Sequence, residues 1–369
     1  MPNLMLQEEI KLGELFSGPG GIATGAFQAS REVGLKVRHV WAVDYDMDSC
    51  HTYARNVLKS KNVELPNSVI NKSVTEVQFE ELEEIDALAF GFPCNDFSIV
   101  GEKRGTSGEF GPLYSYGVKA LNTRKPLFFV AENVGGLRSS KTTSGDSALS
   151  MIIEELRKAG PGYRVYPHYY KFEDYGVPQM RHRVILVGIS EEIADRVNYL
   201  IPAPTYRGRH VSASDALSGI KAGSRRWKNN EFTRQSDVVV ERLKCIKAGE
   251  NAWNSTIDNP DLRLKVKNVK LSQIYRRLRP DRPSYTVTGS GGGGTHVYHW
   301  AEPRALTNRE RASIQSFPRN YDFFGNKASV RKQVGMAVPP RGAYVVFRSI
   351  LMSLRGLDYR HVPSNMPGL

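Results

Sequence analysis

A cysteine follows a proline in the stretch Gly91-Phe92-Pro93-Cys94, where a run of apolar residues ends. A free cysteine is most often a small buried hydrophobic residue. The alternative is a nucleophile, which needs a partly exposed, electropositive setting that keeps the thiol as thiolate. Other polar residues in the chain must decide between these two interpretations of Cys94.

A carboxylate and two arginines also have types suited to chemistry. Glu132, in AENVGGL, ends another apolar run, and an unpaired acid is costly to bury, so it should face a crevice or a partner. Gln179, Arg181 and Arg183 alternate along the chain, and within a strand this spacing would put all three on one face. Each residue alone has a structural explanation, but a cysteine, a carboxylate and paired arginines are an unusual combination.

The turn ELFSGPGGIATGAF places Phe16, Gly18 and Gly20 between an expected strand and an expected helix. Glycines let backbone amides and a helix N-terminus approach a ligand closely. Such turns serve dinucleotides and other adenosine cofactors alike, and the dinucleotide fingerprint fails because residue 23 is alanine. The turn therefore indicates an adenosine cofactor without naming it.

The second expected strand ends at Asp44. Its carboxylate could accept hydrogen bonds from both ribose hydroxyls of such a cofactor, and the neighbouring Tyr45 could stack on adenine. The alternative is that Asp44 is an ordinary acid in a surface turn.

Short apolar strands alternate with amphipathic helices from residue 11 to about 188. This rhythm predicts an α/β fold with a largely parallel sheet covered on both faces. Ligands of such sheets bind at the carboxyl ends of the strands, where the polar residues above stand. The expected strands are 11–16, 37–44, 85–92, 126–134 and 183–189, and the expected helices are 21–32, 46–60, 114–123 and 145–159.

After residue 188 the sequence becomes irregular and basic. Residues 201–280 hold 17 Lys and Arg against 7 Asp and Glu, an excess of 10 within the net charge of +13 of the chain. This distribution is typical of a phosphate-binding surface, with a solvated basic face as the alternative. The glycine run 289–296 is either a loop or hinge near nucleic acid or an inert linker. The last forty residues regain a helical period and could pack back on the first domain.

Several classes of protein are disfavoured. The chain has no stretch of about 18 apolar residues and no signal-peptide pattern, so we expect an intracellular protein without a membrane span. Its three cysteines, Cys50, Cys94 and Cys245, are far apart and lack CxxC spacing. This argues against a disulfide framework and a zinc site.

Six motifs in order resemble those of DNA (cytosine-5) methyltransferases of the bacterial and phage modification type, over nearly the whole chain. They are ELFSGPGG, GFPCNDFS, ENV, QMRHR, the pair YRRLRPDRPSYTVTG and RALTNRERASIQSFP, and VGMAVPP. The resemblance implies an S-adenosylmethionine-dependent methyltransferase fold, with a Rossmann-like mixed sheet and a smaller target recognition domain. The catalytic domain would comprise 1–188 and 329–369, and the recognition domain with its bracing motif 189–328.

The resemblance also implies a mechanism on a cytosine flipped out of double-stranded DNA. Cys94 would add to carbon 6 of the ring, Glu132 would hydrogen-bond nitrogen 3 and the amino group, and Arg183, with Arg181 nearby, would hold the carbonyl oxygen. The methyl donor is S-adenosyl-L-methionine, and no metal takes part. We expect a monomer in the prokaryotic cytoplasm, associated with DNA, with a possible cognate restriction endonuclease.

Cofactor-binding residues are carried over by position from the motifs. They are Phe16, Gly18, Gly20, Asp44, Tyr45, Ser73, Pro93 and Leu113. The chain departs from the family at Ser73, where an aspartate is frequent, at Asn95, usually glutamine, at Phe110, usually arginine, and at Met336, usually asparagine. Cys94, Glu132 and Arg183 match, so we expect activity.

The sequence is also compatible with rival functions. A transfer RNA cytosine-5 methyltransferase would share the fold, but its Cys-Phe-Thr signature does not occur in 189–328. A catalytically silent DNA-binding relative is a second alternative, disfavoured by the retained Cys94, Glu132 and Arg183. A methyltransferase acting on an exocyclic amine would need a [DN]-P-P-[YFW] loop, which is absent, and a dehydrogenase would leave Cys94 unexplained.

Overall fold

The computed structural model describes residues 8–92, 113–139, 147–264, 273–292 and 294–369. The chain forms two compact units. Unit 1 comprises Met1–Lys171, His182–Pro204 and Gly342–Leu369, and unit 2 comprises Phe172–Arg181 and Thr205–Arg341. The assignment of catalysis and target recognition to separate parts of the chain stays a prediction.

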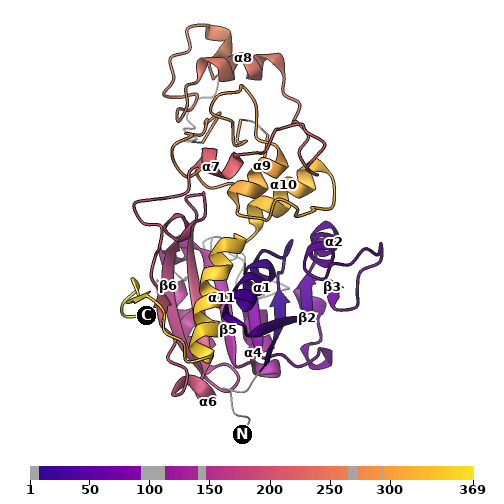
Figure 1. The fold of residues 1–369 in the computed structure, drawn as a ribbon, viewed down its shortest axis with the longest axis vertical. Coiled ribbons are helices and arrows are strands. Elements are labelled where there is room, and N and C mark those ends of the chain that lie inside the picture. Colours follow the sequence, from indigo (N-terminus) through magenta and orange to yellow (C-terminus); the bar gives the residue numbers. More distant parts are fainter. Residues whose placement is uncertain (1–7, 93–112, 140–146, 265–272, 293) are drawn as a thin grey trace, which may run out of the picture. The chain divides into compact units, whose positions relative to one another are not determined.

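Unit 1 is an α/β structure around one mixed sheet of the order β3-β2-β1-β4-β5-β7-β6 (Figure 1). Neighbouring strands are parallel from β3 to β5, whereas β7 runs antiparallel to both β5 and β6. The predicted α/β fold with a mixed sheet is confirmed. The strands of this sheet are β1 (Glu9–Leu15), β2 (Lys36–Asp44), β3 (Val69–Asn71), β4 (Ala87–Gly91), β5 (Phe128–Val134), β6 (Tyr163–Lys171) and β7 (His182–Ser190).

Helices and short segments complete unit 1. The helices are α1 (Gly21–Val33), α2 (Met47–Asn56), α4 (Tyr114–Arg124), α5 (Ala148–Lys158), α6 (Glu191–Ala194) and α11 (Pro340–Leu354), which enters unit 1 at Gly342. Single 3-10 turns are η2 (Val74–Glu76), η3 (Phe79–Glu81) and η5 (Gly135–Ser139), and β8 (Ile201–Pro202) pairs with β9 (His361–Val362). Each of the four expected helices and five expected strands has a counterpart here; β3 and β6 were not expected.

Alternation along the central strands separates two buried faces of the sheet. Phe90 and Phe129 lie on one face, in the same core as residues of α4 and α5. A Cβ atom on Gly117 of α4 would lie 2.5 Å from the Phe90 ring, so glycine permits this close packing. Phe128 points to the other face and meets Phe347 of α11, with ring centroids 6.2 Å apart. The expected return of the C-terminal helix to the first part of the chain is therefore confirmed (Figure 1).

Unit 2 consists of short helices joined by long irregular segments. Its elements are η6 (Phe172–Tyr175), α7 (Ala213–Leu217), α8 (Asp237–Cys245), η7 (Pro260–Leu262), α9 (Asn308–Ile314) and α10 (Lys327–Met336). The helices α9 and α10 lie side by side and share one apolar core with α7 (Figure 1). A second core forms around Leu243 of α8.

Buried polar side chains brace this irregular unit. Arg309 of α9, 1% exposed, donates to the backbone oxygens of Lys228 and Tyr321. Gln315 donates to the backbone oxygens of Val334 and Ala337, each at 2.9 Å. Such bonds satisfy carbonyls that no regular element would pair. They give the motif RALTNRERASIQSFP a structural role within unit 2.

Candidate active site

The sheet reverses its direction of growth between β1 and β4. From β1 the chain adds β2 and β3 on one side, and β4 and β5 then follow on the other side. A ligand crevice is expected at the carboxyl ends of the strands next to such a switch point. The residues at these ends are Phe16 after β1, Asp44 at the end of β2, Gly91 of β4 and Glu132 of β5.

The turn after β1 adopts a backbone conformation that side chains seldom tolerate. Phe16 has φ 53°, Gly18 has φ 52° and Gly20, which precedes α1, has φ 89°. A left-handed non-glycine residue costs about 1–2 kcal/mol, and such strain is concentrated at functional sites. A Cβ atom on Gly18 would meet nothing within 4 Å. The backbone at Gly18 therefore borders open space, as a ligand that lies against the turn requires.

Asp44 ties the ends of β1 and β2 together. Its Oδ2 accepts a hydrogen bond from the Gly18 amide at 2.7 Å, and its Oδ1 accepts one from the Asp46 amide at 2.9 Å. A carboxylate oxygen has a second acceptor position, which a hydroxyl group can use. The adjoining Tyr45 is 68% exposed.

Glu132 and Arg183 meet at the ends of two antiparallel strands. Arg183 lies in register with Val134, and its Nε is 2.6 Å from Oε1 of Glu132. Each of the two side chains is 12% exposed, so the ion pair is largely desolvated. A Cβ atom on Gly91 would lie 3.3 Å from Oε2 of Glu132. The glycine in the neighbouring strand thus leaves room for the carboxylate.

The end of β5 is also fastened to the segment that leads to the cysteine. Asn133 donates from Nδ2 to the Phe92 backbone oxygen at 2.9 Å, and Asn133 is 2% exposed. Pro93, Cys94, Asn95 and Phe110 lie outside the described residues. This hydrogen bond holds Phe92, the last described residue before Cys94, next to the end of β5, which carries Glu132.

Gln179 and Arg181 do not share a strand face with Arg183, because β7 begins only at His182. Both belong to unit 2, whereas Arg183 belongs to unit 1. Oε1 of Gln179 accepts from the Val287 amide at 2.8 Å, and Nη1 of Arg181 donates to the Val287 oxygen at 3.3 Å. These contacts organise unit 2, and the catalytic role of Arg181 stays a prediction.

The remaining predicted cofactor residues lie at element ends. Ser73 follows β3 and caps the turn η2, its Oγ accepting from the Thr75 amide at 3.4 Å. Leu113 precedes α4 and packs, half-buried, against the main core of unit 1. Met336, at the end of α10, is 67% exposed. The cofactor roles of Ser73 and Leu113 stay predictions.

A buried polar chain below the strained turn was not expected from the sequence. Glu14 of β1 is 1% exposed and accepts from the Tyr53 hydroxyl at 2.5 Å, and this hydroxyl lies 3.0 Å from Nδ1 of His39. Burial raises the pKa of Glu14 to about 7 and lowers the pKa of His39 to about 4. The available signal was an acid among apolar residues in a strand otherwise predicted to be buried.

The raised pKa of Glu14 predicts how stability depends on pH. Between its ordinary value of 4.5 and about 7, the folded protein keeps a proton that the unfolded chain releases. The free energy of unfolding contributed by Glu14 should therefore fall as pH rises through this window, by about 3 kcal/mol. Glu14→Gln has no titrating group at this position and so lacks this loss. The difference between the free energies of unfolding of the wild type and of Glu14→Gln, measured by urea denaturation, should therefore decline by that amount between pH 4.5 and 7.

His39 acts in the opposite direction and makes the difference measurement necessary. Because its pKa is lowered from 6.5 to about 4, its contribution to stability rises with pH across that interval. This contribution is common to the wild type and Glu14→Gln and cancels in the comparison. A stability difference that stays constant across the pH series would show that Glu14 titrates normally.

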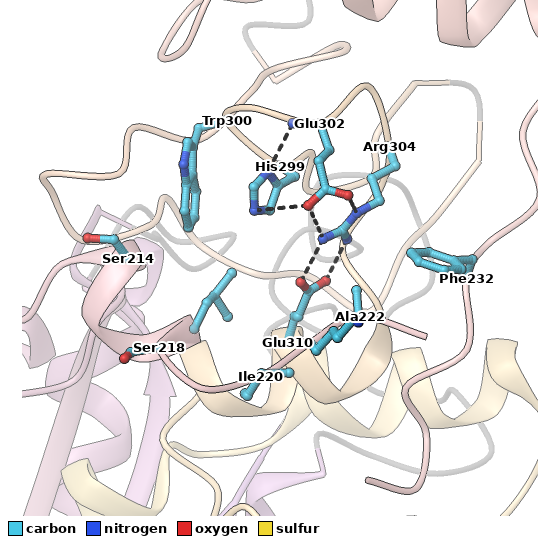
Figure 2. Close-up of a pocket in the computed structure, with 12 residues that line it drawn as sticks. Ser214, Ser218, Ile220, Ala222, Phe232, His299, Trp300, Glu302, Arg304 and Glu310 are labelled. Atoms are coloured by element: carbon cyan, nitrogen blue, oxygen red, sulfur yellow. Dashed lines mark hydrogen bonds and ion pairs between the residues drawn. The ribbon is translucent and has the colours of Figure 1, made fainter. Parts of the chain in front are cut away.

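A cavity of about 510 Å³ lies within unit 2 (Figure 2). Arg304 on its wall contacts Glu310 through two hydrogen bonds, at 2.8 and 2.9 Å, and also bonds Glu302. His299 and Trp300 stack nearby with centroids 4.1 Å apart. None of the predicted site residues lines this cavity. Arg304, Glu302 and Glu310 are engaged with one another, which gives this wall of the cavity a structural role in unit 2.

Some of the positive charge of residues 201–280 is engaged internally. Nε of Arg207 is 3.7 Å from Oδ2 of Asp174, and Nζ of Lys228 is 2.6 Å from Oδ2 of Asp322. Both cations remain well exposed, with 75% and 64% of their side chains accessible. Exposed ion pairs of this kind contribute little to stability. The basic stretch therefore presents cationic side chains on the protein surface.

Comparison with known proteins shows similarity over nearly the whole chain. The sequence pattern of the family described as C-5 cytosine-specific DNA methylase matches residues 10–352. The Type II methyltransferase M.BbvI of Brevibacillus brevis is 50% identical over 366 residues, which cover 96% of this chain and 94% of the relative. The Type II methyltransferase M.NgoFVII of Neisseria gonorrhoeae is 35% identical, with coverages of 92% and 86%.

A solved structure supports the same fold. The methyltransferase EhMeth of Entamoeba histolytica superposes with a TM-score of 0.62 at 15% sequence identity. The superposition covers 94% of this chain and 98% of that protein. At this level of identity the likeness concerns the fold alone.

Proposed function

The chain belongs to the C-5 cytosine-specific DNA methylase family, and from this membership we propose a specific reaction. The enzyme transfers a methyl group from S-adenosylmethionine to carbon 5 of a cytosine flipped out of a specific double-stranded DNA sequence. The transfer proceeds through a covalent adduct between the base and Cys94. The observation that supports this most directly is the desolvated ion pair between Glu132 and Arg183 at the strand ends beside Gly91.

The turn after β1 fits S-adenosylmethionine. Phe16, Gly18 and Gly20 have left-handed backbone conformations, and the space beside Gly18 is open. Asp44 has acceptor positions for ribose hydroxyls, and the exposed Tyr45 offers a ring for adenine. Bound S-adenosylmethionine would supply an electrophilic methyl group on a sulfonium, whose sulfur would leave as a neutral thioether. Pro93, Ser73 and Leu113 complete the proposed cofactor residues.

The side chains of this protein then activate the base. The base must leave the stack because its ring carbons are otherwise inaccessible. The Cys94 thiolate forms a bond to carbon 6, which breaks the double bond between carbons 5 and 6 and makes carbon 5 nucleophilic. After methylation, loss of the carbon 5 proton and departure of Cys94 restore the aromatic ring.

Glu132 and Arg183 stabilise the adduct by electrostatics. Glu132 holds nitrogen 3 and the amino group of the cytosine, so that the ring accepts electron density as the sulfur adds. Arg183, with Arg181 as a second cation, holds the carbonyl oxygen. Because the Glu132–Arg183 pair is already ordered and largely shielded from water, little reorganisation is needed when charge develops.

Asp44→Asn is expected to weaken S-adenosylmethionine binding about 10- to 100-fold. The amide has one acceptor oxygen, and its NH₂ group would face a backbone donor, either Gly18 or Asp46. Isothermal titration calorimetry of the full chain measures the change. Asp48→Asn, in the first turn of α2, removes the same charge and should bind like the wild type. Equal affinity of Asp44→Asn and the wild type would remove Asp44 from the cofactor site.

The proposed reaction is tested by identifying its product. The protein is expressed in a host that lacks cytosine methylation, and genomic DNA is digested to nucleosides and analysed by mass spectrometry. We expect 5-methylcytosine, and bisulfite sequencing should locate it in one recurring sequence. N4-methylcytosine, or no methylation by a folded protein, would refute the proposal. Purified enzyme that methylates transfer RNA instead of duplex DNA would favour the transfer RNA alternative.

The relatives are called Type II methyltransferases, and this supports a role in restriction and modification. We propose that a cognate endonuclease acts on the same DNA sequence and that the enzyme works as a monomer in the prokaryotic cytoplasm. In the part of the chain that the structure describes, no helix is both long and apolar enough to cross a bilayer.

A further inference from the structure

Residues 288–291, where the glycine run begins, are closely packed against α10. A Cβ atom on Gly335 of α10 would lie 2.1 Å from the Gly289 backbone nitrogen. A Cβ atom on Gly291 would lie 2.3 Å from Nε of Arg331. Gly335 thus lets the backbone of residues 288 and 289 approach α10, and Gly291 leaves room for the Arg331 side chain. Residues 288–291 therefore form a fitted surface segment, which an inert linker would not require.

Two arginines with unused donors lie against this segment. Arg311 of α9 is 1% exposed, and its Nη2 donates to the Thr288 oxygen at 2.6 Å. Its Nε and Nη1 have no hydrogen-bond partner among the described residues, nor does Nε of Arg331. Buried guanidinium N–H groups normally have a hydrogen-bond acceptor, so these three nitrogens are expected to bind one supplied by a ligand.

Positive charge is concentrated around residues 288–291. Among the described residues, neither Arg311 nor Arg331 forms an ion pair, and α10 carries Lys327, Arg331 and Lys332 without an acid. Burial and the neighbouring Arg331 lower the pKa of Arg311 to about 10. His296 also faces the two arginines, and burial together with their charge lowers its pKa to about 4. The imidazole thus stays neutral and adds no charge at neutral pH.

We propose that Arg331, Arg311 and the backbone of residues 288–291 form a binding site for one backbone phosphate of the DNA. Arg331, which is half-buried beside Gly291, makes the direct contact. Arg311 lies beneath, holds Thr288 through its carbonyl, and supplies a charge that forms no ion pair among the described residues. A phosphate matches the planar fork of a guanidinium and carries the charge that the cluster lacks. This inference depends on the proposed function in one respect, because it takes DNA as the ligand.

Such a contact positions the duplex without reading its sequence. Its signature is the dependence of affinity on salt, because each phosphate contact releases condensed counterions. Arg331→Gln is expected to lower the affinity for a fluorescently labelled non-specific duplex about 3- to 10-fold at low salt. The slope of log affinity against log salt concentration should become shallower by about 1. Binding is measured with the full chain by fluorescence anisotropy over a KCl series.

Arg279→Gln is the matched control in the same unit. Arg279 is exposed and bonds Asp281 at 2.7 and 3.0 Å, so its removal deletes equal charge without deleting a free donor. Its salt slope should equal that of the wild type. An unchanged slope in Arg331→Gln with a wild-type melting temperature, or an equal change in both variants, would overturn the site. DNA methylation by the wild type is measured in a separate assay. Failure of the phosphate site would therefore appear in the salt slopes, and failure of the methyltransferase assignment would appear in the methylation assay.

Discussion

Replacing Cys94 with alanine is expected to abolish methyl transfer to DNA while duplex binding remains at the wild-type level. Carbon 5 of cytosine is a poor nucleophile until a thiolate has added to carbon 6, and alanine offers no group that can add. Loss of a nucleophile costs on the order of 10⁴-fold or more in rate. The measurement is transfer of labelled methyl groups to duplex DNA, with anisotropy as the binding assay.

Cys245→Ala is the matched control for this substitution. Cys245 is a free cysteine of intermediate exposure, at the end of α8, and its thiol donates to the Glu241 oxygen at 3.5 Å. Its removal should leave activity unchanged. A duplex with 5-fluorocytosine at the target adds a direct readout, because fluorine cannot depart as the proton does and the adduct persists. Residual methylation by Cys94→Ala, or its covalent trapping, would contradict the mechanism.

Glu132→Gln is expected to have the second largest effect, a fall in kcat of about 10²–10³-fold. A single preorganised group that meets developing charge typically has an effect of this size. Glutamine keeps the shape but loses the charge that orders Arg183 at 2.6 Å. Steady-state kinetics on the mapped DNA sequence should show the loss mainly in kcat, because the interaction strengthens as the adduct forms.

The same substitution should also destabilise the fold. It leaves Arg183, with 12% of its side chain exposed, without its carboxylate, which is expected to cost about 3 kcal/mol. Kinetics are therefore measured well below the melting temperature. Glu32→Gln is the control, since Glu32 pairs with Arg348 at 2.6 Å in the same unit but is 47% exposed. Wild-type kcat in a folded Glu132→Gln protein would remove Glu132 from the mechanism.

Arg183→Gln provides a reciprocal check on the ion pair. The double variant Glu132→Gln/Arg183→Gln should lose less stability than the sum of the two single losses, because the pair is disrupted only once. Additive losses would mean that the two side chains act independently despite their contact. Thermal denaturation of the four proteins provides the comparison.

Strands with a clear pattern were predictable, whereas two others were not. The strands that became β1, β2, β4, β5 and β7 are runs of mostly apolar residues, because both of their faces are buried. β6 (Tyr163–Lys171) instead has the sequence YRVYPHYYK, with polar residues and Pro167 on an edge strand, where proline is tolerated. β3 has only three residues, too few for a period to be recognised.

Spacing misled the interpretation of one motif. Gln179, Arg181 and Arg183 alternate, which would place them on one face of a strand. The strand starts only at His182, and the first two residues bond Val287 in unit 2. Alternation predicts a shared face only where the backbone is extended throughout, and the sequence does not show where the extension begins.

The sequence alone determined the alternation of elements, the polar residues at strand ends and the motif order that identifies the family. These features are local, because burial imposes a period on neighbouring residues and turns require particular residue types. Tertiary structure decided which side chains meet. The antiparallel register brings Arg183 to Glu132, and the packing of α9 and α10 places Arg311 and Arg331 against the glycine segment. Such pairings join residues remote in sequence, and they depend on strand direction and helix packing, which no local pattern encodes.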